Sequence, residues 1–366
     1  MSQLLDSTPR ADGFHMPGEH EPQERVLMAW PESPENWREE AVPAQQAYAA
    51  VASAISEVTP VTLCVSTAQY PVARRCLPPG VELLEIPSND SWMRDIGPTY
   101  VVNGAQRRGV DWVFNAWGGD VNGLYEDWDD DDAMAARLLA YRGEDRYRAP
   151  MVMEGGALHV DGEGTLYTTQ ECLRHPGRNP QLSREEIETL LADFLGIEKI
   201  IWLKQGLYND ETDGHVDNLL HVARPGEVLL TWCDDAQDPM YDICREALAV
   251  LHSSRDARGR EIIVHKLPLP GPLYVTAEEA AGVRNPDDGL SRTPGERLAG
   301  SYANFLITNG LIVYPLLDEA TDAQAAAVLA DVFPQYRVVG VPGREILLGG
   351  GNIHCITQQV PALPVG

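Results

Sequence analysis

Residues 311–341 read LIVYPLLDEATDAQAAAVLADVFPQYRVVGV, which predicts a strand, a helix and a second strand in succession. The apolar run 311–316 is short and leads into acidic residues, as a buried strand that ends in a loop would. Hydrophobic residues then recur at helical spacing over 323–333, and Asp322 is placed to cap the first turn of that helix. The second strand is predicted at 337–341.

The same succession occurs four more times along the chain, and internal repeats of this kind define the architecture of a fold. In the third copy, Ser183 and Glu186 form a capping box at the start of the helix. Five such units favour a closed five-bladed α/β propeller of ββαβ-type modules with pseudo-fivefold symmetry, and an ordinary open α/β sheet is the alternative. No linker is evident, so we expect residues 1–366 to form a single domain. The other four copies are predicted at 26–30, 43–56 and 61–65; at 112–116, 133–141 and 151–153; at 165–169, 184–195 and 199–203; and at 228–232, 241–251 and 261–265.

The 366-residue chain carries 28 Lys and Arg against 55 Asp and Glu, a formal charge of −27. So acidic a protein repels phosphate backbones and anionic lipids, which makes nucleic acid and membranes poor partners, whereas a small cationic substrate is attracted. No apolar run approaches the roughly 18 residues of a membrane span. The polar N-terminal segment has no apolar core of the signal-peptide type, so we expect a cytoplasmic protein.

Two polar clusters follow predicted strands in the first half of the chain. In residues 89–98, Asp95 lies close to Trp92 and Arg94, an arrangement that fits either a salt-bridged turn or a corner that binds a cation. In residues 153–161, Glu154 is followed by two glycines. Because glycine permits close approach of the backbone, an acid held beside such a turn is a candidate site residue.

The most informative cluster is 209–218, where four acids surround His215. The chain looks extended after the glycine at position 214, so His215 and Asp217 are expected to point to the same side. This arrangement would place a general acid or base beside a carboxylate that binds a cation, and a solvated acidic loop is the alternative. A single histidine makes a transition-metal site improbable here. The six cysteines of the chain include no C-x-x-C pair, which argues against zinc and against a disulfide framework.

A cysteine near the C-terminus has the setting of a nucleophile. Three glycines, residues 349–351, are expected to lead into a strand that presents Cys355 to a closely approaching substrate. His354 would face away from it on such a strand, so His215 is the better partner. Acids around a thiol raise its pKa, which disfavours a cysteine peptidase. They suit a guanidinium substrate, whose N–H groups match carboxylates and whose carbon is open to attack by sulfur.

The sequence resembles the agmatine deiminases of the guanidine-modifying superfamily along nearly its whole length. Each shared motif is short, and their joint presence in order makes the resemblance specific. The motifs are F-H-M-P-G-E (14–19), W-P-E-x-P-x-N-W-R (30–38), N-D-S-W-M-R-D-x-G-P (89–98), F-N-A-W-G-G (114–119), E-G-G-x-x-H-V-D-G-E-G-T (154–165), D-E-T-D-G-H-V-D-N (210–218) and G-G-G-N-I-H-C-I-T-Q-Q (349–359).

The resemblance implies a five-bladed α/β propeller, known as a pentein, and a role for each matching residue. Cys355 matches the nucleophile, and His215 matches the general acid that protonates ammonia and then the base that activates water. The remaining matches are Asp95 and Asp217, which grip the guanidinium; Glu154, which orients His215; Trp92, which flanks the methylene chain; and Glu211 and Asp213, candidates for the distal ammonium.

The implied reaction is hydrolysis of agmatine to N-carbamoylputrescine and ammonia, a step toward putrescine, with neither a metal nor an organic cofactor. The resemblance also suggests a homo-oligomer. Two alternatives stay open. An arginine deiminase would need Arg or Lys at the pocket mouth to bind the substrate carboxylate, and a non-catalytic polyamine-binding protein would need neither Cys355 nor His215.

Overall fold

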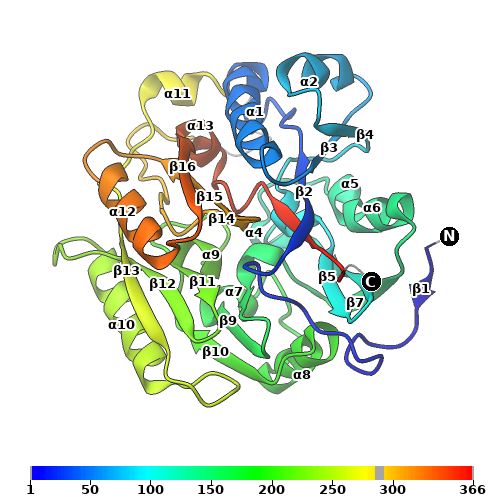
Figure 1. The fold of residues 1–366 in the computed structure, drawn as a ribbon. Helices are drawn as coiled ribbons and strands as arrows, with labels where there is room; N and C mark the ends of the chain where they lie inside the picture. Colours follow the sequence, from blue (N-terminus) through cyan, green and yellow to red (C-terminus); the bar gives the residue numbers. More distant parts are fainter. Residues whose placement is uncertain (1, 285–291, 365–366) are drawn as a thin grey trace.

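The computed structural model describes residues 2–284 and 292–364, and the strands among them form five sheets (Figure 1). In every sheet the first strand pairs antiparallel with the second, and the second pairs parallel with a third. Parallel neighbours need a crossover connection, and in each unit a helix supplies it. The described chain is therefore built from five ββαβ units.

The bounds of the elements are as follows. The sheets are β17 (Gln358–Pro361), β2 (Gln23–Ala29), β3 (Val61–Val65) and β4 (Glu82–Glu85); β5 (Thr99–Asn103), β6 (Gln106–Val113), β7 (Arg146–Val152) and β1 (Leu4–Leu5); β8 (His159–Val160), β9 (Thr165–Thr169) and β10 (Lys199–Leu203); β11 (Leu220–Arg224), β12 (Glu227–Trp232) and β13 (Ile263–Pro268); and β14 (Leu306–Thr308), β15 (Leu311–Leu316) and β16 (Arg337–Pro342). The helices are η1 (Glu39–Ala41), α1 (Val42–Ser56), α2 (Tyr70–Cys76), α3 (Met93–Ile96), α4 (Gly119–Asn122), α5 (Asp129–Asp132), α6 (Met134–Arg142), η2 (Gly155–Ala157), α7 (Gln170–Leu173), α8 (Arg184–Leu195), α9 (Val216–Leu219), α10 (Met240–Ser253), α11 (Ala277–Ala281), α12 (Asp322–Val332) and α13 (Arg344–Gly349).

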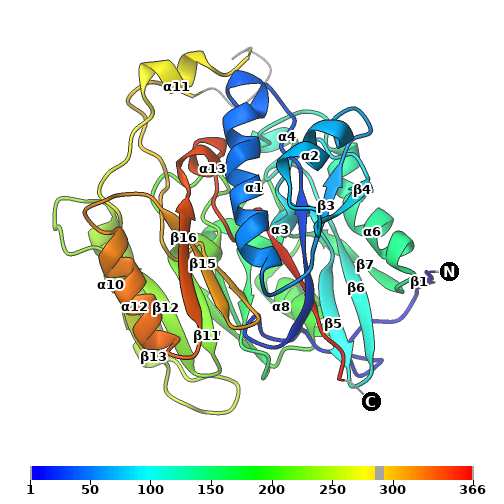
Figure 2. The same cartoon turned by 45° about the horizontal axis from the view of Figure 1, so that its top comes forward.

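The third unit follows its predicted boundaries closely. Its helix α8 begins with the predicted capping box of Ser183 and Glu186 and ends at Gly196, whose φ of 66° suits a glycine C-cap. Ile187 and Leu191 on one face of α8 are buried in the same hydrophobic cluster as Leu166 of β9. Figures 1 and 2 show α1, α6, α8, α10 and α12 around the outside of the molecule, with the sheets between them and the middle.

Some boundary predictions were wrong. The strand predicted to reach residue 116 ends at Val113, because Ala116 and Trp117 have φ values of 53° and 60°, which an extended strand does not allow. In the fifth unit Asp322 does not cap α12. Its Oδ1 accepts hydrogen bonds from the backbone N–H groups of Leu317 and Asp318, so it stabilises the preceding loop instead. The strand predicted at 261–265 begins later, at the start of β13.

The last strand, β17, and the first strand of the first unit, β2, meet in one sheet. β17 pairs antiparallel with β2, with Gln358 opposite Leu27, so the segment just before β17 lies beside the N-terminal unit. In each sheet, a polar residue of interest lies within a few positions before the first strand. These residues are Asp95 before β5, Glu154 before β8, Asp217 before β11, Asn304 before β14 and Cys355 before β17. Over the described residues, none of the helices combines the length and apolarity that a membrane crossing requires.

Candidate active site

Cys355 lies in a turn between α13 and β17, and its side chain is only 5% exposed. The predicted strand around it was therefore wrong, since β17 begins three residues later. The amide Nδ2 of Asn304 is 3.0 Å from the sulfur, and Oδ2 of Asp217 is 3.7 Å away. A Cβ on Gly351 would lie 3.0 Å from the sulfur and 2.6 Å from Trp92, so this position requires glycine.

His215 and Asp217 belong to a helical turn at the start of α9, not to the extended segment that the sequence predicts. Oδ2 of Asp217 is 2.8 Å from Nδ1 of His354, so His354 faces this carboxylate. Its other oxygen, Oδ1, is buried without a hydrogen-bond partner among the described residues, and the same is true of both ring nitrogens of His215. Buried polar atoms are normally paired, so these atoms point to a polar ligand.

The second carboxylate, Asp95 on α3, is held by two donors, one from its own unit and one from the next. The backbone N–H of Gly156 donates to Oδ1 at 2.8 Å, and the indole N–H of Trp117 donates to Oδ2 at 2.9 Å. Nδ1 of His215 is 3.9 Å from Oδ2. A Cβ on Gly156 would lie 2.5 Å from Nδ1 of His215 and 3.1 Å from Oδ2 of Asp217, so the second glycine of the E-G-G motif keeps the centre of the site open.

Glu154 is fully buried behind His215. Its Oε2 is 3.8 Å from Nε2 of His215, and its Oε1 accepts a hydrogen bond of 2.8 Å from Nε of Arg178. The same guanidinium also donates to the backbone oxygens of Trp117 and Thr212. Arg178 therefore connects Glu154 to the two segments that hold Asp95 and His215.

One ring face of Trp92 and its indole N–H are already engaged by other side chains. Its ring stacks on Trp37 with centroids 5.3 Å apart, and its indole N–H donates to Asp90 at 2.7 Å. The far edge of the ring reaches Gly351, next to Cys355. Trp92 therefore packs against the residue next to the thiol.

The two acids predicted for a distal cation differ in their surroundings. Asp213 is engaged by Arg178 at 2.6 Å and by Asn122 at 3.0 Å. Glu211 pairs through Oε1 with Arg292, while its Oε2 has no hydrogen-bond partner among the described residues. That oxygen would lie 2.7 Å from a Cβ on Gly350, so it faces residues 349–351, which we call the glycine loop. Gly351, the next residue, is the one that lies against Cys355.

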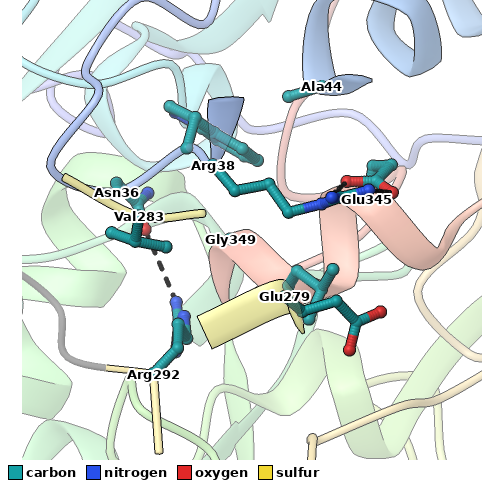
Figure 3. Close-up of a pocket in the computed structure, with 10 residues that line it drawn as sticks. Asn36, Arg38, Ala44, Glu279, Val283, Arg292, Glu345 and Gly349 are labelled. Carbon is teal, nitrogen blue, oxygen red and sulfur yellow. Dashed lines mark hydrogen bonds and ion pairs between the residues drawn. The ribbon is translucent and has the colours of Figure 1, made fainter. Parts of the chain in front are cut away.

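Arg292 lies in a small cavity beside the site, shown in Figure 3. Its guanidinium points toward Asn36, at 3.5 Å from Oδ1, and the cavity wall includes Gly349. Arg38 and Glu345 form a bidentate ion pair on the opposite side of the same cavity. The glycine loop is thus supported from behind by charged pairs.

The structure brings Cys355, His215, Glu154, Asp95 and Asp217 into one site, and it adds residues that sequence reasoning missed. Asn304 donates to the thiol, Trp117 fixes Asp95 and Arg178 fixes Glu154. Asn304 had a signal that could have been used, because it precedes the first strand of its unit as the other four site segments do. Trp117 lies in the quoted F-N-A-W-G-G motif, just after the strand predicted at 112–116, and has a positive φ. Nothing in the local sequence distinguishes Arg178.

Burial and nearby charges set the protonation of these groups. Burial raises the pKa of Asp95 to about 6, and the carboxylates of Asp217 and Glu154 contribute to that increase. Burial opposes the charge of Glu154, but Arg178 and His215 lower its pKa to about 2. Burial also disfavours a charged His215, yet Asp95 and Glu154 raise its pKa. Burial, Asp217 and Asp95 all raise the pKa of Cys355, so its thiol is neutral.

Two buried groups of side chains have donor atoms close enough together to consider a metal ion. In the first, Glu154 already accepts a hydrogen bond from Arg178. In the second, Nε2 of His354 is 2.8 Å from Oε2 of Glu19, a hydrogen-bond distance, whereas two ligands of one tetrahedral zinc lie about 3.3 Å apart. Both groups are therefore better described as ion-paired networks. Their members are Glu154, Cys172 and His215, and Glu19, His159, His221 and His354.

Comparisons with known proteins give one consistent picture. The family model described as Porphyromonas-type peptidyl-arginine deiminase matches residues 15–361. The agmatine deiminase of Ectopseudomonas mendocina is 58% identical over 361 residues, covering 98% of this chain and 98% of that protein. The agmatine deiminase of Pseudomonas aeruginosa strain LESB58 is 58% identical over 359 residues, covering 97% and 98%. The solved structure of Enterococcus faecalis agmatine deiminase superposes with a TM-score of 0.96 at 45% identity, covering 99% of each chain.

Proposed function

This chain belongs to the Porphyromonas-type peptidyl-arginine deiminase family, and we propose that it hydrolyses agmatine to N-carbamoylputrescine and ammonia through a covalent intermediate on Cys355. The observation that supports this most strongly is a buried thiol with two buried carboxylates, Asp95 and Asp217, beside it. Such an arrangement of charge attracts a cationic ligand. A guanidinium offers paired N–H donors to the carboxylates and an electrophilic carbon to the sulfur.

The first half of the reaction forms a bond to sulfur and releases ammonia. Binding of the guanidinium offsets the charges of Asp95 and Asp217, which favours loss of the thiol proton to solvent. The thiolate of Cys355 then attacks the guanidinium carbon. The C–N bond to the terminal nitrogen breaks as the imidazolium of His215 gives that nitrogen a proton, and ammonia leaves a thiouronium on Cys355.

The second half returns the enzyme to its starting state. Neutral His215 takes a proton from water, the oxygen attacks the thiouronium carbon, and the C–S bond breaks as the proton left on that oxygen passes to the departing sulfur, which restores the thiol of Cys355 and the protonated form of His215. Glu154 holds His215 in place and favours its protonated form, and Asn304 donates to the sulfur throughout. Of the two acids predicted for the distal ammonium, we assign that role to Glu211, because its Oε2 faces the glycine loop whereas Asp213 is engaged by Arg178.

The proposal also covers the architecture of the chain, its assembly and its location in the cell. We take the five ββαβ units as the blades of a pentein propeller with pseudo-fivefold symmetry over one domain, 1–366, in which the segments before the first strands converge on the site. A homo-oligomer in the cytoplasm that uses neither metal nor organic cofactor is the expected form, and nucleic acid and membranes are not expected partners.

The pH dependence of kcat/KM follows from Asp95. Its pKa of about 6 in the free site means that lowering the pH through this value protonates it and removes its attraction for the guanidinium. We expect kcat/KM for agmatine to fall below pH about 6, whereas kcat, which reports the complex, keeps its value to lower pH because bound substrate favours the carboxylate. Steady-state profiles of both parameters check this, and a kcat/KM that is constant across this range would contradict it.

The reaction itself is tested by release of ammonia and of the ureido product from agmatine and from L-arginine at equal concentration. We expect rapid turnover of agmatine and little of arginine, since Glu211 would repel a carboxylate at the far end of the substrate. Turnover of arginine alone would keep the cysteine chemistry and overturn the substrate. Binding of agmatine without turnover would favour the polyamine-binding alternative.

A further inference from the structure

A line of three buried side chains runs from the site into the interior. Nδ1 of His354 is 2.8 Å from Oδ2 of Asp217, and Nε2 of His354 is 2.8 Å from Oε2 of Glu19. Both separations are hydrogen-bond distances and both partners are carboxylates, so the ring donates from both nitrogens. An imidazole that donates from both nitrogens is protonated. We call Glu19, His354 and Asp217 the inner triad.

The far end of the inner triad is anchored. Oε1 of Glu19 accepts a hydrogen bond of 2.7 Å from the backbone N–H of Ile307, at the start of the fifth sheet. The three triad side chains are at most 6% exposed, so their charges are poorly solvated and depend on one another. Glu19 lies in the quoted F-H-M-P-G-E motif, and the reaction proposed above uses neither it nor His354.

The charged and titratable groups around His354 come from several elements. The carboxylates are Asp217 on α9 and Glu19 ahead of β2. Arg94 on α3 brings a guanidinium within 3.6 Å of Oε2 of Glu19. The rings of His159 on β8 and His221 on β11 lie 4.8 Å and 5.2 Å from the ring of His354, between centroids. Burial lowers the pKa of both of these histidines, so they are neutral.

We propose that Glu19 and His354 are positioning residues, which keep Asp217 ionised and fixed through Oδ2 so that Oδ1 is free for the substrate guanidinium. This inference rests on the proposed function, because it gives that unpartnered oxygen its ligand. With His354 protonated, two cations, His354 and Arg94, balance two carboxylates in this buried layer. Without that proton the layer has a net negative charge next to Cys355.

Comparison of Asp95 with Asp217, the two carboxylates proposed to bind the guanidinium, supports this role of His354. Asp95 has a charged partner only at 3.9 Å, in His215, and burial raises its pKa to about 6. Asp217 is equally buried, yet the hydrogen bond and charge of His354 lower its pKa. This difference between the pKa shifts of Asp95 and Asp217 follows from the position of the imidazolium of His354. It leaves Asp217 charged at pH values where Asp95 begins to take up a proton.

Kinetics of two variants test the role of the triad. His354→Asn keeps an amide donor near the position of Nδ1 but loses the charge and the contact with Glu19. The pKa of Asp217 should then rise, so the acid limb of kcat/KM for agmatine should move up by about one pH unit and become steeper. At pH about 6 the loss should be about tenfold, and at pH about 8 it should nearly vanish. Glu19→Gln should shift the limb in the same direction by less.

The matched control is His265→Asn. His265 on β13 also places an imidazole nitrogen near a carboxylate, with Nε2 3.2 Å from Oε2 of Glu227, but it belongs neither to the inner triad nor to the residues of the site. Its pH profile should match that of the wild type. A loss of kcat/KM by one constant factor at every pH in His354→Asn would indicate a merely structural role and would overturn the proposal.

A readout without substrate separates this inference from the proposed function. In protein with isotopically labelled histidine, NMR should show the ring of His354, assigned through His354→Asn, still protonated above the ordinary imidazole pKa, and Glu19→Gln should lower that titration. A His354 that titrates in the ordinary range, in an enzyme that turns over agmatine, would overturn the role of the triad alone. A protonated His354 in a wild-type protein that does not turn over agmatine would overturn the proposed function alone.

Discussion

Replacing Cys355 with serine is expected to reduce turnover of agmatine by at least about 10⁴-fold while agmatine still binds. The hydroxyl occupies nearly the same space as the thiol, so the carboxylates of Asp95 and Asp217 and the donor of Asn304 stay in place. Oxygen at this position is a far weaker nucleophile than sulfur, because a hydroxyl in an acidic, buried site does not ionise. Ammonia release measures the loss, and calorimetry on the variant measures binding.

Cys233→Ser is the matched control for this change. Cys233 is also buried, at 8% exposed against 5% for Cys355, and follows β12 away from the site. It should retain wild-type activity. Ammonia release from Cys355→Ser within tenfold of the wild type would show that another group performs the attack.

Asp217→Asn is expected to cost at least about 3 kcal/mol in transition-state stabilisation, which is a loss of more than about 100-fold in kcat/KM. The amide preserves the shape of the side chain and can still accept a hydrogen bond from His354. It has no charge to offset the guanidinium, and its NH₂ group would face the substrate with a donor where an acceptor is needed. Steady-state kinetics with agmatine measure the effect.

Asp111→Asn separates lost catalysis from lost stability. Asp111 on β6 is as buried as Asp217 and pairs with Arg146 and Arg148, but it lies in the sheet of the second unit and is not one of the site residues. This variant should lower the melting temperature and leave kcat/KM for agmatine unchanged. A kcat/KM for Asp217→Asn close to the wild-type value would contradict the proposal that this carboxylate binds the guanidinium.

The sequence predicts the repeated units well because the hydrophobic periods that define them are local. The elements of the third unit occur where the pattern put them, down to the capping box of Ser183. The strand predicted through residue 116 was wrong because the sequence does not reveal the positive φ of Ala116. Trp117 follows with a positive φ as well, and its indole donates to Asp95, a contact between segments on either side of β5 and β6 that no local pattern encodes.

The same contrast holds for the site, because its motifs are visible in the sequence but its contacts between distant segments are not. Cys355, His215 and the carboxylates stand in recognisable motifs, and the structure brings them together. The extended geometry expected around both His215 and Cys355 was wrong, since each lies in a tight turn. For that reason His354, expected to face away from the chemistry, instead contacts Asp217. Partners such as Asn304 and Arg178 come from distant segments, so only the fold could place them.

The central claim is that the sulfur of Cys355 forms a bond to the guanidinium carbon. Mass spectrometry of enzyme quenched in acid during turnover of agmatine tests it most directly. The account predicts a fraction of the protein heavier by the mass of agmatine less that of ammonia, with the added mass on the peptide that contains Cys355. Wild-type enzyme that releases ammonia at its full rate and never shows this adduct, at any time of quenching, would contradict the claim.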